Sequence, residues 1–192
     1  MKIINKHKIG LLGGTFDPPH KGHLHISRAA INILKLHNLY WSIANQNPLK
    51  QLKPKLTINQ RMLLAKKIIK KNKKILLLKK NKSQKLNYSI NEINFIKEIE
   101  KNSVLFFIIG ADNLVHFHKW KNYKTILKKC VIIVMHRPGY KIKALQSKLA
   151  KQHKKLKINL TQLKENNYTE NKWIYLNIKG INLSSSMIRN SL

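Results

Sequence analysis

The stretch Gly13-Gly14-Thr15-Phe16-Asp17-Pro18-Pro19-His20-Lys21-Gly22-His23, or GGTFDPPHKGH, directly follows the apolar run Ile9-Gly10-Leu11-Leu12. The apolar run is typical of a buried strand, and the residues from His23 onward have helical spacing. The stretch therefore predicts a strand-to-helix turn early in the chain. Its two glycines allow a tight turn and a close approach to a ligand, and Asp17-Pro18-Pro19 restricts the path between glycines and histidines.

His20 and His23 lie three residues apart near the start of the predicted helix. At that spacing both side chains can project on one side of the helix N-terminus. Imidazoles beside free helix N–H groups, whether neutral or protonated, suit an anion and in particular a phosphate that gains charge during a reaction. Metal ligation and a purely structural role are the alternatives. Two histidines alone make a poor zinc site, and no third ligand is placed nearby in the sequence.

Strand-length apolar runs alternate with helical patterns along the rest of the chain. We expect strands at 8–12, 39–44, 75–78, 104–109, 130–135 and 173–178. We expect helices at 23–36, from a capping box at 57–60 to about 71, from a second capping box at 89–92 onward, at 122–129 and at 142–154. Segments 45–56, 79–86 and 164–172, rich in Asn and Lys, are expected to be loops.

This alternation predicts an α/β fold, a Rossmann-like doubly wound parallel sheet with helices on both faces. No repeat or boundary interrupts the pattern, so we expect residues 1–192 to form a single domain. In such a fold, ligands bind beyond the carboxyl ends of the strands, near the point where the strand order reverses. The unusual polar segments, which are 13–20, 45–50, 110–113, 136–139 and 184–189, follow predicted strands and should converge on that edge.

The charge of the chain is strongly positive, with 39 Lys and Arg against 7 Asp and Glu and a formal net charge of +32. Such an excess favours nucleic acid, anionic membranes or phosphorylated ligands. Nearly all of it is lysine, however, and Lys, Asn and Ile are enriched together, as an AT-rich genome would produce. No arginine-aromatic patch accompanies the lysines. We therefore favour compositional bias on a solvated surface and expect no nucleic-acid partner.

The sequence also indicates where the protein is located. No apolar run is long enough to cross a bilayer, and the basic N-terminus lacks the apolar core of a signal peptide. Cys130 is the single cysteine, so no internal disulfide can form. We expect a soluble, reduced, cytoplasmic protein without a membrane partner.

Five ordered motifs resemble one enzyme family. His20-Lys21-Gly22-His23 resembles the Thr/His-x-Gly-His hallmark of a nucleotidyltransferase superfamily, and Gly-Gly-Thr-Phe-Asp-Pro is similar to bacterial nicotinate-nucleotide adenylyltransferases. The resemblance continues through the Gly-x-Asp segment at 107–114 with Phe117 and Trp120, the Arg-Pro-Gly loop at 137–140 and the C-terminal Leu-Ser-Ser-Ser-Met-Ile-Arg motif at 183–189. It spans residues 9–189, essentially the whole chain.

The resemblance implies transfer of AMP from ATP to the 5′-phosphate of nicotinate mononucleotide, which yields the deamido-dinucleotide and pyrophosphate in NAD biosynthesis. The attacking phosphate is already nucleophilic, so catalysis would be positioning and charge stabilisation. By resemblance, His20 and His23 are catalytic and contact the ATP phosphates, with His23 nearest the α-phosphate. The residues expected to bind ATP are Gly13, Gly14, Thr15, Phe16, Gly110, Asp112, Ser184, Ser185, Ser186 and Arg189. Mg²⁺ would be carried by ATP, because so few carboxylates exist to cage it.

The resemblance also assigns a mononucleotide side. The residues expected there are Asn45, Lys50, Tyr88, Ser89, Trp120 and Arg137. Trp120 would stack on the pyridine ring, the 88–89 segment would face the nicotinate carboxylate through backbone N–H groups, and Asn45, Lys50 and Arg137 would lie toward the phosphate. Asp112 would contact the ATP ribose. The structural alternatives are helix N-caps for Ser89 and Asp112, a loop anchor for Trp120 and a surface position for Arg189.

Other functions remain open on the sequence. The loop Asn47-Pro48-Leu49-Lys50 departs from the family's usual Pro-Pro-His-Lys/Arg, which leaves Lys50 to cover the phosphate alone or with Asn45. Nicotinamide mononucleotide and phosphopantetheine are alternative acceptors, although Trp120 and the Arg137-Pro138-Gly139 loop favour the nicotinate nucleotide. A basic RNA-binding protein is the alternative of a different class. A homo-oligomer is possible.

Overall fold

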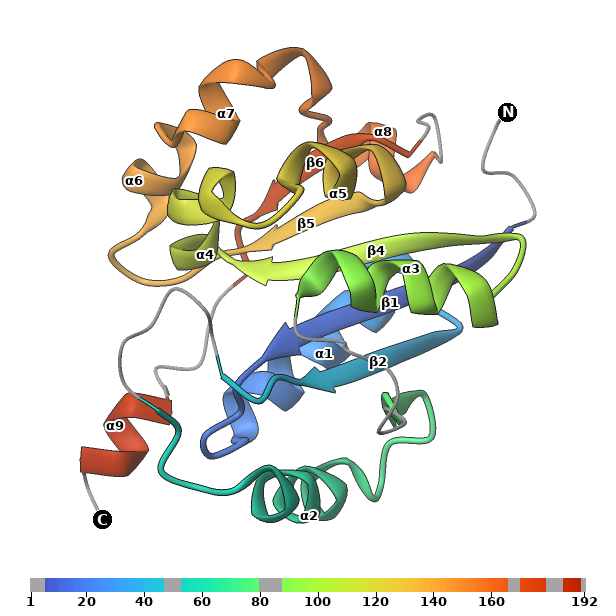
Figure 1. Ribbon diagram of the computed structural model, residues 1–192. Helices are drawn as coiled ribbons and strands as arrows, with labels where there is room; N and C mark the ends of the chain where they lie inside the picture. Colours follow the sequence, from blue (N-terminus) through green and yellow to red (C-terminus); the bar gives the residue numbers. More distant parts are fainter. Residues whose placement is uncertain (1–5, 47–52, 80–87, 166–169, 179–184, 191–192) are drawn as a thin grey trace.

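The computed structural model describes residues 6–46, 53–79, 88–165, 170–178 and 185–190. Its centre is a six-stranded sheet in the order β3-β2-β1-β4-β5-β6 (Figure 1). The strands are β1 (His7–Gly14), β2 (Asn38–Ile43), β3 (Ile75–Leu77), β4 (Ser103–Gly110), β5 (Val131–Met135) and β6 (Lys172–Leu176). All neighbouring strands are parallel. The predicted doubly wound parallel sheet is therefore confirmed, and the strand order reverses between β1 and β4.

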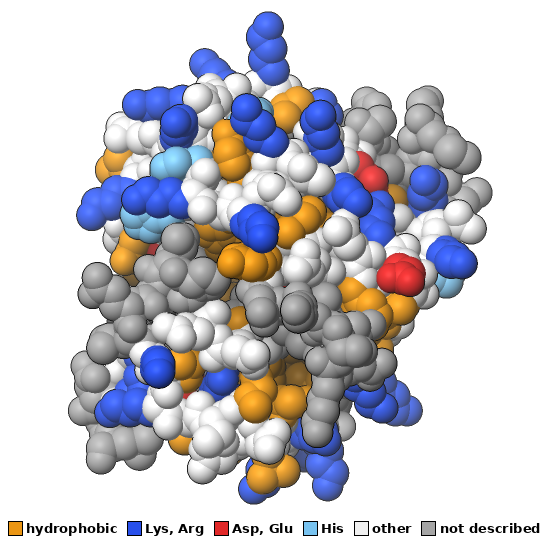
Figure 2. Space-filling view, in the orientation of Figure 1, with side chains coloured by type: hydrophobic (Ala, Val, Ile, Leu, Met, Phe, Trp, Pro, Cys, Tyr) orange, Lys and Arg blue, Asp and Glu red, His pale blue; other side chains and the backbone are white. Residues whose placement is uncertain are grey.

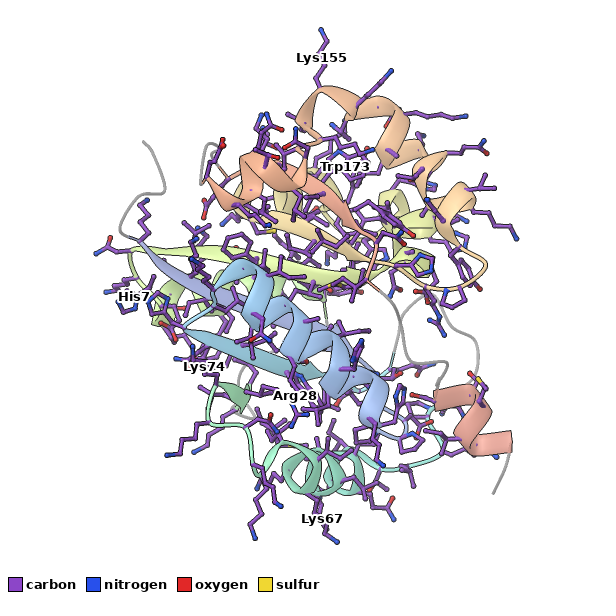
Figure 3. All side chains as sticks on the ribbon, turned by 180° about the vertical axis from the view of Figure 1, so that it is seen from behind. His7, Arg28, Lys67, Lys74, Lys155 and Trp173 are labelled. Atoms are coloured by element: carbon purple, nitrogen blue, oxygen red, sulfur yellow. The ribbon has the colours of Figure 1, made fainter. Side chains whose placement is uncertain are left out.

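Helices cover both faces of the sheet. One face carries α1 (Lys21–Leu34), α2 (Ile58–Ile69) and α8 (Leu160–Lys164), and Figure 3 shows α1 lying across it. The other face carries α3 (Ser89–Ile99), α4 (Ala111–His116), the 3-10 turn η1 (Phe117–Lys119), α5 (Tyr123–Lys129), α6 (Lys141–Leu145) and α7 (Lys148–Gln152). The turn η2 (Lys154–Leu156) precedes α8, and α9 (Ser185–Asn190) lies near the end of the chain.

The central strands are apolar on both sides because helices cover both faces. In β4, Phe106 and Ile108 pack toward α1, whereas Phe107 and Ile109 pack toward α3 and α4, and all four are buried. Gly10 in β1 allows close packing, since a Cβ there would lie 2.7 Å from Leu36 Cδ1 and the Leu36 side chain would have to shift. This continuous apolar pattern made the strands predictable from sequence.

Two local predictions for helices were wrong. The single helix expected over 142–154 is divided into α6 and α7, because the Ser147 hydroxyl accepts a hydrogen bond from the Ala150 N–H and begins a new helix. The capping box expected at 89–92 is absent, because the N-cap of α3 is Tyr88 and makes no side-chain cap. The box at Thr57 and Gln60 is confirmed, with both reciprocal hydrogen bonds present.

The surface is dominated by lysine. Figure 2 shows blue lysine and arginine side chains spread over the visible face, with few acidic side chains among them. Among the described residues, three charged side chains are instead buried, namely Asp17, Arg61 and Glu92, with exposures of 3%, 2% and 5%. All three lie in or beside the loops at the carboxyl edge of the sheet. Within the described segments, no helix is both long and apolar enough to span a membrane.

Candidate nucleotide-binding site

The candidate site lies where β1 and β4 end side by side. β1 leads into the 15–20 segment and α1, while β4 leads directly into α4. His20 is the N-cap of α1, and its Nδ1 accepts a hydrogen bond from the Gly22 N–H at 3.1 Å. His23 Nδ1 accepts from the His20 N–H at 3.2 Å, which completes a capping box built from two histidines. Their ring centroids are 3.8 Å apart.

These hydrogen bonds decide what the imidazoles can offer a ligand. Because both Nδ1 atoms accept from the backbone, the neutral rings carry their proton on Nε2. Burial, and secondarily Arg137, lowers the pKa of His20 to about 4. Burial, with added contributions from His20 and Arg137, holds the pKa of His23 well below its usual value. At neutral pH both side chains are therefore uncharged and present Nε2–H donors in fixed orientations.

His23 is held by aromatic packing. Its ring contacts Phe16 at a centroid distance of 4.5 Å, and Phe16 stacks on Trp41 at 4.9 Å. Phe16, rather than a glycine, adopts the left-handed conformation in the turn, with φ of 49°. The expectation that Gly13 and Gly14 form the tight turn was wrong, because both continue β1. The Phe16 ring is 1% exposed, so it supports His23 from within the core.

The double role of His20 can be separated by substitution. His20→Ala removes the cap on the Gly22 N–H and should lower the free energy of unfolding by about 1 kcal/mol. His20→Asn keeps a capping acceptor and should restore that stability. Both variants lack the Nε2–H donor. Both should therefore lose about 10²-fold in kcat for the AMP transfer that the sequence motifs imply. Denaturant unfolding and steady-state kinetics measure the two effects. Recovery of turnover in His20→Asn would show that His20 acts only as a cap.

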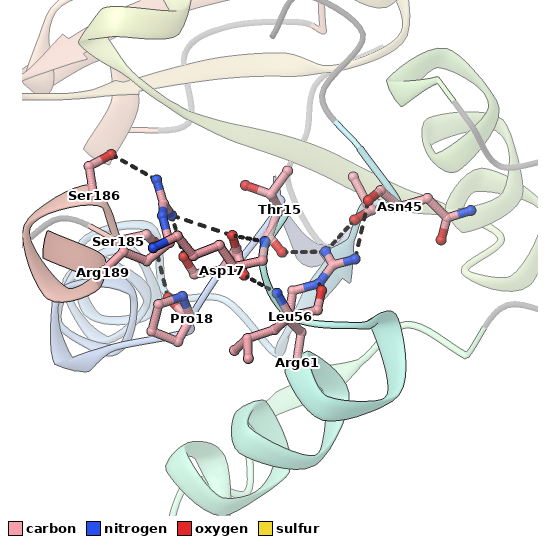
Figure 4. A network of polar contacts seen from close by, with 11 residues as sticks. Thr15, Asp17, Pro18, Asn45, Leu56, Arg61, Ser185, Ser186 and Arg189 are labelled. Atoms are coloured by element: carbon pink, nitrogen blue, oxygen red, sulfur yellow. Dashed lines mark hydrogen bonds and ion pairs between the residues drawn. The ribbon is translucent and has the colours of Figure 1, made fainter. Parts of the chain in front are cut away.

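Arg61, a buried arginine that the sequence analysis did not assign to the site, donates hydrogen bonds to several segments at the sheet edge. The Arg61 guanidinium donates to the carbonyls of Thr15 at 2.6 Å, Ala44 at 2.6 Å, Asn45 at 3.1 Å and Leu56 at 3.0 Å (Figure 4). It thus joins the segments after β1 and β2 to the start of α2. The available signal was its rarity, because arginines are few among the lysines of this chain.

Asp17 joins the first loop to the C-terminal motif. Its carboxylate accepts from the backbone N–H groups of Lys55 at 2.9 Å and Leu56 at 3.0 Å, and one oxygen lies 3.5 Å from Arg189 Nη1. Arg189 also donates to the Asp17 carbonyl and, at 3.2 Å, to Ser186 Oγ (Figure 4). Ser185 Oγ donates to the Pro18 carbonyl at 3.0 Å. Arg189 is therefore bonded to the protein itself, and its binding of ATP stays a prediction.

The first turn of α4 and the loop after β5 meet through an ion pair. Arg137 Nη1 donates to Asp112 Oδ2 at 2.5 Å. The N-cap of α4 is Gly110, so the alternative role of Asp112 as a helix N-cap was wrong. A Cβ on residue 110 would overlap the Asp112 carboxylate, which explains the glycine. The other carboxylate oxygen, Oδ1, is buried and has no hydrogen-bond partner among the described residues.

The predicted mononucleotide residues are only partly brought together. Trp120 is half-buried and packs on Phe117 and Phe107, at centroid distances of 5.0 Å and 6.0 Å. The Tyr88 side chain is 38% exposed, and Lys121 Nζ lies 4.5 Å from the centroid of its ring. These contacts place the start of α3 beside η1. Lys50 and Ser184, which were also predicted, lie outside the described residues.

The described residues form no ready-made metal cage. Across the described ranges, no three His, Cys, Asp or Glu side chains gather closely enough to hold an ion. Cys130 is buried, and its thiol donates to the Ile126 carbonyl at 3.1 Å. The polar groups at the sheet edge include several donors, namely the two imidazoles, Arg137, which pairs with Asp112, and Arg189, which pairs with Asp17. Such a set suits an anionic ligand.

The chain is similar in sequence to one family model and to named bacterial proteins. The family model for cytidylyltransferase-like proteins matches residues 11–191. A protein of Pelagibacter ubique (strain HTCC1062) is 42% identical over 96% of this chain and 93% of its own length, and it is named a probable nicotinate-nucleotide adenylyltransferase. A Ruegeria sp. (strain TM1040) protein of the same name is 32% identical, over 94% of this chain and 95% of its own.

Solved structures show the same fold. The nicotinic acid mononucleotide adenylyltransferase of Plasmodium falciparum, complexed with NaAD, matches with a TM-score of 0.68 and 20% identity, over 96% of this chain and 83% of that one. The same enzyme complexed with APC matches with a TM-score of 0.66 and 18% identity, over the same shares of the two chains.

Proposed function

Because the chain belongs to the family of nicotinate-nucleotide adenylyltransferases, within the cytidylyltransferase-like proteins, we propose that it transfers AMP from ATP to nicotinate mononucleotide. A phosphate oxygen of the mononucleotide attacks the α-phosphorus, the bond from that phosphorus to the bridging oxygen of the β-phosphate breaks, and pyrophosphate leaves. The products are nicotinate adenine dinucleotide and pyrophosphate. The observation that carries the proposal is the pair of neutral, backbone-anchored imidazoles at the switch point of the sheet.

The two histidines supply hydrogen bonds to the charge that develops on the phosphates. Their Nε2–H groups are already oriented, so little reorganisation accompanies the reaction. The attacking phosphate requires no general base, so the protein acts by alignment and charge stabilisation. His23 packs against Phe16 and lies edge-on to Trp41, and we assign it to the α-phosphate.

Asp112 is suited to the ATP ribose. Its buried Oδ1 has no partner among the described residues, and a hydroxyl donor would satisfy it. Arg137 holds the opposite carboxylate oxygen and fixes the orientation of the side chain. Gly110 provides the space for the carboxylate to fold back over the start of α4. We place the adenosine half beside this loop.

The triphosphate belongs between the histidines and the C-terminal motif. Ser185 and Arg189 bond to the 17–18 segment, two residues before His20, and Ser186 accepts a hydrogen bond from Arg189. Arg189 would exchange part of its bonding to Asp17 for phosphate oxygens. Members of this family generally use a divalent metal with ATP, and we propose Mg²⁺ carried on the triphosphate, where it neutralises charge on the leaving pyrophosphate.

The mononucleotide belongs on the α3 and η1 side. Trp120 offers a half-buried indole for the pyridine ring, and the 88–89 segment lies beside it through the contact of Lys121 with Tyr88. Asn45 follows β2, and its carbonyl accepts a hydrogen bond from Arg61; we assign its side chain to the mononucleotide phosphate. Oligomeric state, the cytoplasmic location and the preference for nicotinate over nicotinamide stay predictions.

A pyrophosphate-release assay with ATP and a panel of acceptors tests the function. We expect turnover with nicotinate mononucleotide in excess of that with nicotinamide mononucleotide or phosphopantetheine. Trp120→Ala should raise KM for the mononucleotide by roughly tenfold, because a stacked ring and its buried area are lost, while KM for ATP changes little. Turnover with phosphopantetheine alone, or with no acceptor in the panel, would reject the proposal. An unchanged mononucleotide KM would remove Trp120 from the site.

A further inference from the structure

Glu92 is a buried acid that the proposed chemistry does not use. Glu92 lies in the first turn of α3 and is 5% exposed. Oε1 accepts a hydrogen bond from Ser42 Oγ at 2.5 Å. Oε2 lies 3.6 Å from the position that a Cβ on Gly13 would occupy. Gly13 and Ser42 are register partners on β1 and β2, so the carboxylate lies over the pair of strand ends at the site.

This face of the sheet leads directly to the proposed mononucleotide residues. The same Cβ position on Gly13 is 3.9 Å from Phe107 Cε2, and Phe107 packs against Trp120. Glu92 also follows Ser89 by three residues, which places both within one turn of α3. The carboxylate therefore lies between the Gly13 strand end and the helical turn that begins at Tyr88.

A second acid on α3 has the same chemistry far from the site. Glu100, at the other end of the helix, accepts a hydrogen bond from Tyr40 Oη at 2.5 Å. Tyr40 and Ser42 are two residues apart on β2 and so lie on the same face of the strand. Two carboxylate–hydroxyl bonds thus attach α3 to β2. Only the bond of Glu92 lies at the carboxyl edge of the sheet.

Burying a carboxylate costs free energy unless hydrogen bonds or an opposite charge offset the loss of its hydration. A plain apolar contact would attach α3 to the sheet, as Ile90, Ile93 and Ile96 already do. The hydrogen bond of Glu92 adds a defined distance and direction between the helix start and the strand end, which apolar contacts specify poorly. Its location near the N-terminus of α3 is also favourable for a negative charge.

We propose that Glu92 is a positioning residue for the mononucleotide, which it serves by holding the Tyr88–Ser89 turn of α3 at a fixed distance from Gly13. This inference rests on the proposed function. The carboxylate does not touch substrate. It keeps the acceptor subsite preformed, so its loss weakens mononucleotide binding and leaves the ATP side, on the loops around His20 and Asp112, largely intact.

Four variants of the full chain test the inference, namely Glu92→Ala, Glu92→Gln, Ser42→Ala and the matched control Glu100→Ala. We expect Glu92→Ala to raise KM for nicotinate mononucleotide by about tenfold while KM for ATP stays within about twofold. Glu92→Gln keeps the shape and an acceptor oxygen, so it should rescue most of the loss. Glu100→Ala removes an equivalent hydrogen bond and should lower thermal stability without changing either KM.

The outcomes separate positioning from stability alone. Equal changes in KM for Glu92→Ala and Glu100→Ala, or a parallel rise in KM for both substrates, would overturn the inference. If Glu92→Ala does not fold, Ser42→Ala carries the test, with a selective rise of about threefold expected. Calorimetric titration of the wild-type protein with nicotinate mononucleotide is the second readout. A wild-type protein that neither binds nor turns over this nucleotide refutes the proposed function, whereas normal wild-type kinetics with unselective variants refute only the role of Glu92.

Discussion

Replacing His23 by Ala is expected to lower kcat by about 10²–10³-fold, or ~2.7–4 kcal/mol of transition-state stabilisation. The variant loses an Nε2–H donor whose direction is set by the His20 N–H and by packing against Phe16. Substrate binding relies on many other groups, so KM for ATP and for the mononucleotide should change far less. Pyrophosphate release under saturating substrates measures the effect.

The control must disturb the same packing without removing the donor. Trp41→Phe does so, because Trp41 lies against Phe16 and edge-on to His23, at centroid distances of 4.9 Å and 6.1 Å. It also loses the hydrogen bond from Trp41 Nε1 to Ser27 Oγ. We expect lower thermal stability and nearly normal kcat. If Trp41→Phe reduces kcat as severely as His23→Ala does, the loss reflects packing rather than a phosphate contact.

Replacing Arg61 by Met is expected to lower the free energy of unfolding by about 3–5 kcal/mol. Methionine fills much of the volume but leaves the buried carbonyls of Thr15, Ala44, Asn45 and Leu56 without their donor, and unsatisfied buried acceptors are costly. Because these carbonyls belong to three segments at the site, turnover should fall together with stability. Denaturant unfolding monitored by fluorescence gives the first quantity.

Arg28→Met is the matched control. Arg28 is exposed and donates through Nε to Asn72 Oδ1 at 3.0 Å. Its loss should change the free energy of unfolding by no more than about 1 kcal/mol. A similar small loss for Arg61→Met would mean that the loops at the site hold together without the buried guanidinium.

Local patterns were sufficient to predict most of the elements. Continuous apolar runs marked each strand, because both faces of a doubly wound sheet are covered. The reciprocal bonds of Thr57 and Gln60 involve residues three apart, so the chain encodes them without reference to the rest of the fold. The same kind of signal failed at Ser89, because α3 begins one residue earlier with Tyr88 as its N-cap, and Glu92 accepts a hydrogen bond from Ser42, 50 residues away in sequence.

The site was predictable where its chemistry is local. His20 and His23 are brought together by one turn of helix and by two backbone hydrogen bonds, all contained within GGTFDPPHKGH. The burial that lowers the pKa of each ring was not predictable from that motif, because Trp41 comes from the next strand. Nor was the left-handed turn at Phe16, whose residue is buried in the core, predictable from the motif, because a glycine is the usual residue in that conformation.

By itself the sequence determined the alternation of strands and helices and the paired imidazoles, since propensity, periodicity and capping act over a few residues. Only the tertiary structure decided that Arg61 would be buried among four carbonyls, that Arg189 would bond to Asp17 across 172 positions, and that Glu92 would face Gly13. The reason is physical: a buried charge takes the partners that the packed strands bring to it, and the order of the strands in the sheet is a property of the whole chain.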